Sequence, residues 1–191
     1  MEKKNLETTK LEILPLTPAR WADCEKVFGP NGCYGCWCMW WRMKGREFSN
    51  SSKEEHKTAL RTIVQNAQEP GLIAYVDGVP AAWVAVAPRD EYVRLKTSRT
   101  LFAVDDQPAW VISCFFIHRN YRRLGLMGLL IDAACDFARS KGASLIEAFP
   151  LQINERTNSA SLFTGVESVF KEHGFSVAAV REHRSIFRKQ L

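Results

Sequence analysis

The segment AWVISCFFI at residues 109–117 constrains the fold of this chain more than any other. It is apolar on both faces, which is typical of a strand in the middle of a sheet that is covered on both sides. In residues 126–137, apolar side chains then recur at spacings of three and four, the pattern of a helix that packs one face on a sheet. A central strand that leads through a turn into such a helix predicts a layered α/β fold.

The other segments alternate between strand-like and helix-like patterns. Strands are predicted at residues 11–16, 72–76, 81–87, 144–149, 175–180 and 183–189, and helices at 18–28, from Lys53 to the Glu69-Pro70-Gly71 stop, and from Thr164 to the His173-Gly174 stop. Ser52 and Thr164 each precede a glutamate by three residues, a capping-box pattern that predicts a helix N-cap at both. Asp77-Gly78 predicts a hairpin turn. Residues 88–109 show no periodicity, so they form either a lid over a site or an element that the pattern does not reveal.

Length and composition fit one domain spanning residues 1–191, since 46% of the residues are hydrophobic and 25% are charged. The net charge of +5 is too small to predict nucleic-acid binding and would suit an anionic ligand equally well. No apolar run reaches membrane-spanning length, and the N-terminal segment MEKKNLETTK lacks the apolar centre of a signal peptide. We therefore expect a cytoplasmic protein that has no membrane partner and whose six cysteines are thiols.

Between the central strand and its helix lies HRNYRRLGLMG, residues 118–128, which has the composition of a phosphate-binding turn. The first N–H groups of a helix have no partners within the helix, and the helix dipole adds partial positive charge there. Gly125 would let a phosphate approach the backbone, while Arg119, Arg122 and Arg123 would add charge. The alternative is an ordinary helix start with solvated arginines. Neither GxxxxGK(S/T) nor GxGxxG is present to decide between the two.

The longer segment IHRNYRRLGLMGLLIDAA resembles the acyl-CoA-binding motif of the GNAT superfamily of N-acyltransferases. That motif has Arg or Gln, two further residues, Gly, one residue, and Gly or Ala. Arg122 and Gly125 fit it, whereas Met127 replaces the last small residue. The segment FKEHGF, residues 170–175, resembles the last helix of the family. The resemblance implies a mixed, mostly antiparallel central sheet flanked by helices on both faces.

The resemblance also implies that acetyl-CoA is the cosubstrate. In the family, the pyrophosphate of CoA rests on the turn amides, which implies backbone contacts from Arg122, Arg123, Leu124, Gly125, Leu126, Met127 and Gly128. The pantetheine arm runs along the end of the central strand, where the family splays two parallel strands, and this places it against Phe115, Phe116 and Ile117. The amide near Ile117 then becomes a candidate donor to the thioester oxygen.

The implied reaction is direct attack of an amine on the acetyl thioester. An ammonium group with a pKa of about 10 must first lose a proton, and Glu147 is the first candidate base, with Glu91 the second. Glu147 also fits a strand residue that pairs with an arginine. Many family members protonate the departing thiolate with a tyrosine at the position of Phe170. Cys114 and Tyr121 are the remaining candidate donors, although Cys114 also fits a buried hydrophobic position, and a thiolate with a pKa of about 8.5 can leave unassisted.

Residues 32–43 read GCYGCWCMWWRM, a concentration of cysteines and aromatic side chains. A metal site is not predicted, because the three cysteines lack an obvious second pair of ligands and the four histidines are scattered singly. The family places its acceptor-binding wall in the connection between the first two helices, which is where this stretch falls. The resemblance therefore implies acceptor contacts from Cys38, Trp40, Trp41 and Arg42, while the residues alone also fit a cap over the core.

The leading hypothesis is thus an acetyltransferase that acts on a small-molecule amine or a protein amino group. A non-catalytic acyl-CoA-binding or sensing module is a second hypothesis, because the tyrosine expected at position 170 is missing. A metal or redox protein built on the cysteine cluster is a third. The basic residues form no sustained stripe with interleaved aromatics, so nucleic acid is not an expected partner. The oligomeric state stays open, a homodimer included.

Overall fold

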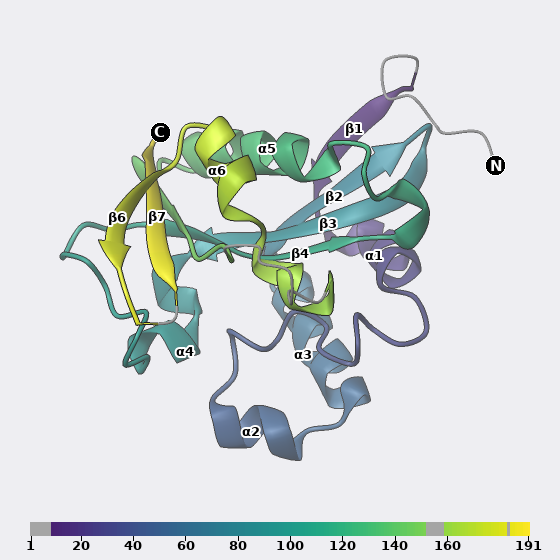
Figure 1. Cartoon of the computed structure of the whole chain (residues 1–191). Helices are drawn as coiled ribbons and strands as arrows, with labels where there is room; N and C mark the ends of the chain where they lie inside the picture. Colours follow the sequence, from purple (N-terminus) through teal and green to yellow (C-terminus); the bar gives the residue numbers. More distant parts are fainter. Residues whose placement is uncertain (1–8, 152–158, 183) are drawn as a thin grey trace.

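The protein is described here by a computed structural model that covers residues 9–151, 159–182 and 184–191 and contains a seven-stranded sheet in the order β1-β2-β3-β4-β5-β7-β6 (Figure 1). The strands are β1 (Leu11–Pro15), β2 (Gly71–Val76), β3 (Val79–Pro88), β4 (Trp110–Ile117), β5 (Leu145–Ala148), β6 (Ser176–Val180) and β7 (Ser185–Gln190). The α-helices are α1 (Trp21–Phe28), α2 (Gly45–Asn50), α3 (Lys53–Gln65), α4 (Val93–Lys96), α5 (Leu126–Ser140) and α6 (Glu167–Glu172). Short 3-10 helices cover Pro18–Arg20, Arg89–Glu91, Arg119–Tyr121 and Ser159–Thr164.

Neighbouring strands of the sheet run antiparallel except β4 and β5, which run parallel. The predicted hairpin joins β2 to β3, and its turn residues Asp77 and Gly78 both have positive φ, as expected for an Asp-Gly turn. The side chains of residues 111–115 in β4 are buried, because β4 lies in the middle of the sheet. The prediction of a mixed, mostly antiparallel sheet is confirmed.

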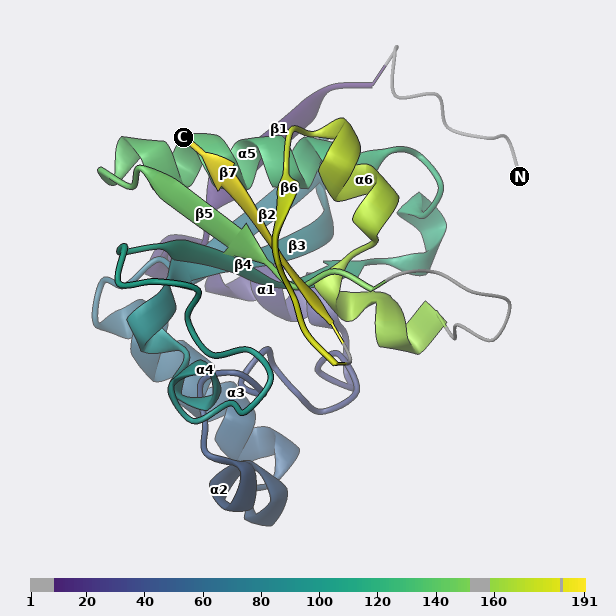
Figure 2. The ribbon, with the colours of Figure 1, turned by 60° about the vertical axis from the view of Figure 1, so that its left-hand side comes forward.

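Helices cover both faces of the sheet, which also confirms the prediction. On one face, Leu130 and Ile131 of α5 belong to the same core cluster as Val84 of β3. On the other face, Leu60 of α3 lies in a second cluster with Trp83. Because side chains alternate along a strand, neighbouring residues of β3 reach opposite layers. Figure 2 shows α5 and α6 on one side of the sheet and α2, α3 and α4 on the other.

β4 and β5 pair only where Trp110–Ile112 lies beside Ile146–Ala148. β5 ends at Ala148, whereas β4 continues to Ile117 along its other neighbour, β3. Within the described residues, positions 113–117 of β4 therefore have no strand partner on their β5 side. A strand edge carries backbone N–H and C=O groups that need partners, so this splay leaves room for a ligand in the centre of the sheet.

Some elements differ from the sequence predictions. The capping box predicted at Thr164 is wrong, because α6 begins after Val166 and makes no side-chain cap there. Thr164 instead ends a 3-10 helix and is buried, and its hydroxyl accepts a hydrogen bond from Arg184 Nη1 (3.1 Å). The sequence pattern also does not reveal α2. In the last predicted strand, residue 183 lies outside the described residues, and β7 begins two positions later.

The aperiodic segment 88–109 forms a 3-10 helix, the short helix α4 and a loop. Tyr92 and Leu95 are buried, so apolar contacts anchor its first half to the body of the protein. No helix in the described part of the chain combines the length and the apolar character needed to cross a bilayer.

Candidate active site

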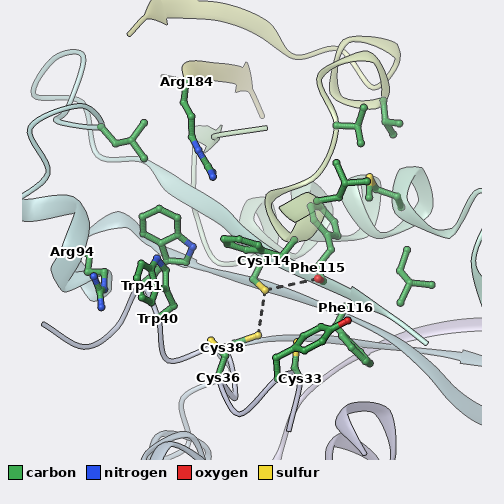
Figure 3. A pocket seen from close by; sticks show the side chains of 18 of the residues that line it. Cys33, Cys36, Cys38, Trp40, Trp41, Arg94, Cys114, Phe115, Phe116 and Arg184 are labelled. Carbon is green, nitrogen blue, oxygen red and sulfur yellow. Dashed lines mark hydrogen bonds between the residues drawn. The ribbon is translucent and has the colours of Figure 1, made fainter. Parts of the chain in front are cut away.

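A cavity of about 1250 Å³ lies at the splayed edge of β4. One part of its wall consists of the cysteine-aromatic stretch, the start of α2 and the loop after α4. The other part consists of the end of β4, the turn before α5 and the segment that leads into α6. The last hairpin contributes Arg184. Figure 3 shows Trp40, Trp41 and Arg94 on one side of Cys114, and Phe115 and Phe116 on the other. The cavity thus joins the segments that the sequence predicts for the cofactor and for the acceptor.

The turn before α5 carries a row of backbone N–H groups that have no backbone partner among the described residues. In the described residues, no backbone hydrogen bond is donated by residues 122–127, whereas Tyr121 N–H donates to His118 (2.8 Å) and Gly128 N–H to Gly125 (3.1 Å). Buried or semi-buried N–H groups normally form a hydrogen bond. The N–H groups of this turn can form theirs with water or with a ligand. Of the residues in this row, Arg122, Arg123, Gly125, Leu126 and Met127 line the cavity.

The backbone of the turn is shaped by residues in left-handed conformation. Gly125 is the N-cap of α5 with φ of +77°, and Arg123 has φ of +63°. Glycine adopts this conformation without steric cost, and a Cβ added at Gly125 would meet nothing within 4 Å, so the space above it is open. Arg122 Nε donates to the carbonyl of Ile117 (3.0 Å), which fixes the turn against the end of β4. The α5 dipole points its positive end at the same space.

Two of the residues predicted for the cofactor do not line the cavity, namely Leu124 and Gly128. Gly128 is buried against α6, since a Cβ there would lie 2.3 Å from His173 Nε2. Gly128 thus packs between α5 and α6, and its predicted contact with the cofactor stays a prediction. The other predicted strand residues, Phe115, Phe116 and Ile117, do line the cavity.

The cysteine-aromatic stretch forms one wall of the cavity and also closes the core beneath it. Cys38, Trp40 and Trp41 line the cavity. The Cys38 and Cys114 sulfur atoms lie 3.4 Å apart, and the Trp83 indole N–H donates to the Cys38 sulfur (3.2 Å). Trp41 Nε1 donates to the carbonyl of Ser113 (3.0 Å), which ties the stretch to β4. Both interpretations made from the sequence, a cavity wall and a core cap, therefore describe parts of the same segment.

The backbone of this stretch is unusual, because Cys33, Tyr34, Trp37 and Cys38 all have φ between +46° and +62°. Such conformations disfavour residues with a Cβ, and surrounding contacts must hold them. One such contact is the buried ring of His56, whose Nδ1 lies 2.7 Å from the carbonyl oxygen of Gly35. The backbone conformation of this wall is thus stabilised by contacts with α3 and not by the intrinsic conformational preference of its residues.

Arg42, which the resemblance assigns to the acceptor, does not line the cavity. Its side chain is only 6% exposed and forms an ion pair with Glu91 (2.6 Å) above the ring of Tyr92. Glu91, the second candidate base, is held by this pair and also lies outside the cavity lining. The positions of Arg42 and Glu91 therefore indicate a structural ion pair.

Glu147, the first candidate base, is fully buried and does not line the cavity. Its carboxylate forms ion pairs with Arg89 and with Arg188, whose Nε donates to Glu147 Oε1 (2.8 Å). Glu147 and Arg188 are cross-strand neighbours on β5 and β7. This arrangement matches the alternative interpretation of a paired strand residue and does not suit a general base at the cavity.

The other predicted catalytic residues, Cys114 and Tyr121, both line the cavity. For Cys114, the hydrogen bond from Cys38 lowers the pKa while burial and neighbouring thiols raise it, and the net shift is upward. Burial raises the pKa of Cys36 to about 11. These thiols are therefore protonated at neutral pH, so they can donate a proton but are poor nucleophiles. Phe170 is buried against Phe115 and Phe175 and offers no polar group.

The charge of the cavity is a feature that the sequence patterns do not reveal. Four arginines line it, Arg94, Arg122, Arg123 and Arg184, and the described lining contains no aspartate, glutamate or histidine. Arg94 and Arg184 are the two that sequence reasoning missed, because both lie outside any motif. Within the described residues, no group of three or more His, Cys, Asp or Glu side chains is arranged to hold a metal ion.

A mixed sheet that splays beside its central strand, with a turn of unpaired amides at the end of that strand, defines the GNAT-like acyl-CoA N-acyltransferase fold. The sequence model of the Acetyltransferase (GNAT) family matches residues 37–164, well over half of the chain, and the protein belongs to that family. A comparison with curated proteins finds no match.

Solved structures share the fold at low sequence identity. The PaiA N-acetyltransferase of Thermoplasma acidophilum in complex with coenzyme A is 15% identical with a TM-score of 0.54, covering 95% of this chain and 99% of that one. The putative acetyltransferase YncA of Salmonella typhimurium with acetyl-CoA is 16% identical with a TM-score of 0.54, covering 95% and 94%. The polyamine N-acetyltransferase of Drosophila melanogaster is 10% identical with a TM-score of 0.55, covering 95% and 100%.

Proposed function

We propose that the protein is an N-acetyltransferase that moves the acetyl group of acetyl-CoA to an amine acceptor by direct attack in a ternary complex. The observation that carries this proposal is the row of N–H groups at residues 122–127, which donate to no backbone acceptor in the described part of the chain and belong mostly to residues that line the cavity. Pyrophosphate oxygens are suitable acceptors for such a row at a helix N-terminus. The CoA and acetyl-CoA complexes of the two related folds from T. acidophilum and S. typhimurium support this choice of ligand.

The open edge of β4 is suited to the pantetheine arm. Successive N–H groups along a strand point to opposite edges, and His118 N–H points to β3, where it donates to Ala81 (3.0 Å). The N–H of Ile117 therefore points to the edge where β5 has already ended. In the proposed complex, this N–H donates to the thioester oxygen and stabilises the negative charge that develops there during attack.

The acceptor amine must be neutral before it attacks. The described lining offers no carboxylate to remove its proton. The guanidinium groups of Arg94 and Arg184 would instead lower the pKa of an ammonium group held near them, because like charges disfavour the charged form. In the proposed reaction, the proton of the ammonium group passes to water in the cavity. The neutral amine nitrogen then forms its bond to the acetyl carbon as the C–S bond breaks, and it loses its second proton to water while the sulfur leaves as a thiolate.

The departing thiolate of CoA takes up a proton from a side chain or from water. Cys114 lines the cavity, and its raised pKa keeps its thiol protonated at neutral pH, so it can donate this proton. The hydroxyl of Tyr121, which also lines the cavity, is the second candidate donor. The structural role of Phe170 leaves no donor at the position that many family members use. A non-catalytic acyl-CoA-binding module is the second candidate function, and this substitution is the observation that favours it.

We expect acetyl-CoA to be consumed only when an acceptor amine is present. The test incubates the full chain with acetyl-CoA and a panel of small amines and lysine-containing peptides, and it measures free CoA thiol together with the mass of the acetylated product. An enzyme releases CoA in proportion to the product formed. A binding module would be stabilised thermally by acetyl-CoA but would release no CoA with any amine. The absence of both stabilisation and release would contradict the proposed function and its alternative together.

A further inference from the structure

Three partly buried arginines in the described part of the chain are neutralised by a carboxylate. Arg42 pairs with Glu91, and Arg89 and Arg188 both pair with Glu147. Such pairing is the rule for buried charges, because an unpaired charge is costly to remove from water. Arg94 and Arg184 are exceptions in the cavity wall, since neither forms an ion pair with any carboxylate in the described part of the chain.

Arg184 is held by neutral acceptors that fix its position but do not balance its charge. Its Nη1 donates to Thr164 Oγ1 (3.1 Å) and to the carbonyl of Phe149 (3.4 Å). Its Nε and Nη2 groups donate to no described residue, which leaves one edge of the guanidinium unused. Figure 3 shows the side chain extending into the cavity toward Trp41. Burial lowers the pKa of Arg184, which indicates that its charge is poorly solvated.

Arg94 supplies a second cation on the same side of Cys114 (Figure 3). Its guanidinium stacks on the indole of Trp40, with 3.7 Å between the Cζ atom and the ring centroid, and it also faces the ring of Phe48. Its Nε and Nη2 atoms are buried without a hydrogen-bond partner in the described residues. Stacking on Trp40 fixes the orientation of the guanidinium, whose positive charge is not balanced by a carboxylate in the described residues.

We propose that the acceptor is a primary amine that also carries a carboxylate, which binds to the unused edge of the Arg184 guanidinium. The proposal rests on the proposed function and narrows its acceptor class. An arginine edge presents two parallel N–H groups that match the two oxygens of a carboxylate. Arg94 adds attraction for the anion, and Trp40 and Trp41 contact the apolar part of the acceptor. Polyamines and other polycations are disfavoured, because they would meet four arginines and, in the described lining, no acidic side chain.

The test compares amino acids with the amines that remain when their carboxylate is removed. Matched pairs are phenylalanine with phenethylamine and tryptophan with tryptamine, and spermidine represents the polycations. For the wild-type protein we expect kcat/KM to be at least about tenfold higher for each acid than for its matched amine. Arg184→Gln is expected to lower kcat/KM for the acids by about 10- to 100-fold, which is the usual effect of losing hydrogen bonds to a charged group. The same variant is expected to change kcat/KM for the matched amines by no more than about twofold.

Two further variants show whether an effect of Arg184→Gln comes from the lost charge, from the lost hydrogen bonds or from impaired folding. Arg184→Lys keeps the charge but not the two-pronged edge, so it is expected to retain part of the preference for acids. Arg181→Gln is the matched control, because Arg181 lies just before the last hairpin turn, stacks on Phe102 at 4.0 Å and does not line the cavity. It should leave the preference unchanged. CoA affinity and thermal unfolding, measured for every variant, show whether a variant is folded.

The proposal is overturned if spermidine or the matched amines are the better acceptors, or if Arg184→Gln lowers both members of a pair equally. In either case amine-dependent CoA release still stands, so the proposed function survives. If CoA binds but nothing is acetylated, the carboxylate site is tested by calorimetry, which measures whether phenylalanine and tryptophan bind to the CoA-saturated protein. Binding that Arg184→Gln abolishes supports the carboxylate site, and no binding of either acid overturns it. Failure of CoA itself to bind removes the proposed function.

Discussion

Replacing Gly125 with valine is expected to weaken the binding of CoA by at least about tenfold. Gly125 has φ of +77°, a conformation that disfavours any residue with a Cβ and a β-branched residue most. The replacement therefore shifts the backbone of the turn and adds atoms to the open space where the pyrophosphate is proposed to bind. Loss of one hydrogen bond to a charged phosphate accounts for a change of this size. Isothermal titration calorimetry with CoA measures it.

Gly142 provides a matched control at the other end of α5. It has φ of +86° and, like Gly125, no atom within 4 Å of an added Cβ, but it does not line the cavity. Gly142→Val should therefore cost a similar free energy of unfolding, on the order of 1–2 kcal/mol, without changing the affinity for CoA. Equal affinities for CoA in the two variants would contradict the role of the turn.

Replacing Glu147 with glutamine is expected to lower the free energy of unfolding by about 3–5 kcal/mol. Glu147 is fully buried between two arginines, so the neutral side chain leaves Arg89 without a carboxylate partner in the described residues and removes one of the two carboxylates that balance Arg188. A loss of this size corresponds to a fall of roughly 10 °C in the unfolding temperature of a protein of this length. Urea denaturation followed by circular dichroism measures the effect.

Asp105 is a suitable control, because it binds the same arginine from the surface. Its side chain is 43% exposed and accepts from Arg188 Nη2 (3.0 Å). Asp105→Asn should change the stability much less than Glu147→Gln, because solvent screens exposed pairs. A general base would behave differently. If Glu147→Gln left stability intact and abolished acetylation of the acceptor, the structural assignment of Glu147 would be wrong.

The local parts of the site could be predicted from the sequence, because each depends on residues close together in the chain. The apolar run of β4, the amphipathic spacing of α5 and Gly125 between them predict a strand, a turn and a helix whose first amides are free. The structure contains all three elements in those places. The DG turn and the Ser52 capping box were predictable for the same reason.

The charge pattern of the cavity could not be predicted, because it depends on contacts between distant segments. Arg184 reaches the cavity only because β6 and β7 pair beside β5 and bring it to Thr164. Glu147 forms an ion pair with Arg188, which lies 41 residues away in the sequence, and does not line the cavity. At Thr164 the local sequence pattern predicts a helix cap, but a hydrogen bond from a distant residue, Arg184, uses its hydroxyl instead. A single arginine or threonine in an aperiodic segment carries no signal of such partners.

Titration of the wild-type protein with CoA and with pantetheine tests the central claim most directly. If the amides of residues 122–127 bind the pyrophosphate, CoA should bind at one site per chain and at least about 100-fold more tightly than pantetheine, which lacks that group. No detectable heat with CoA, or equal affinities for CoA and pantetheine, would contradict the account.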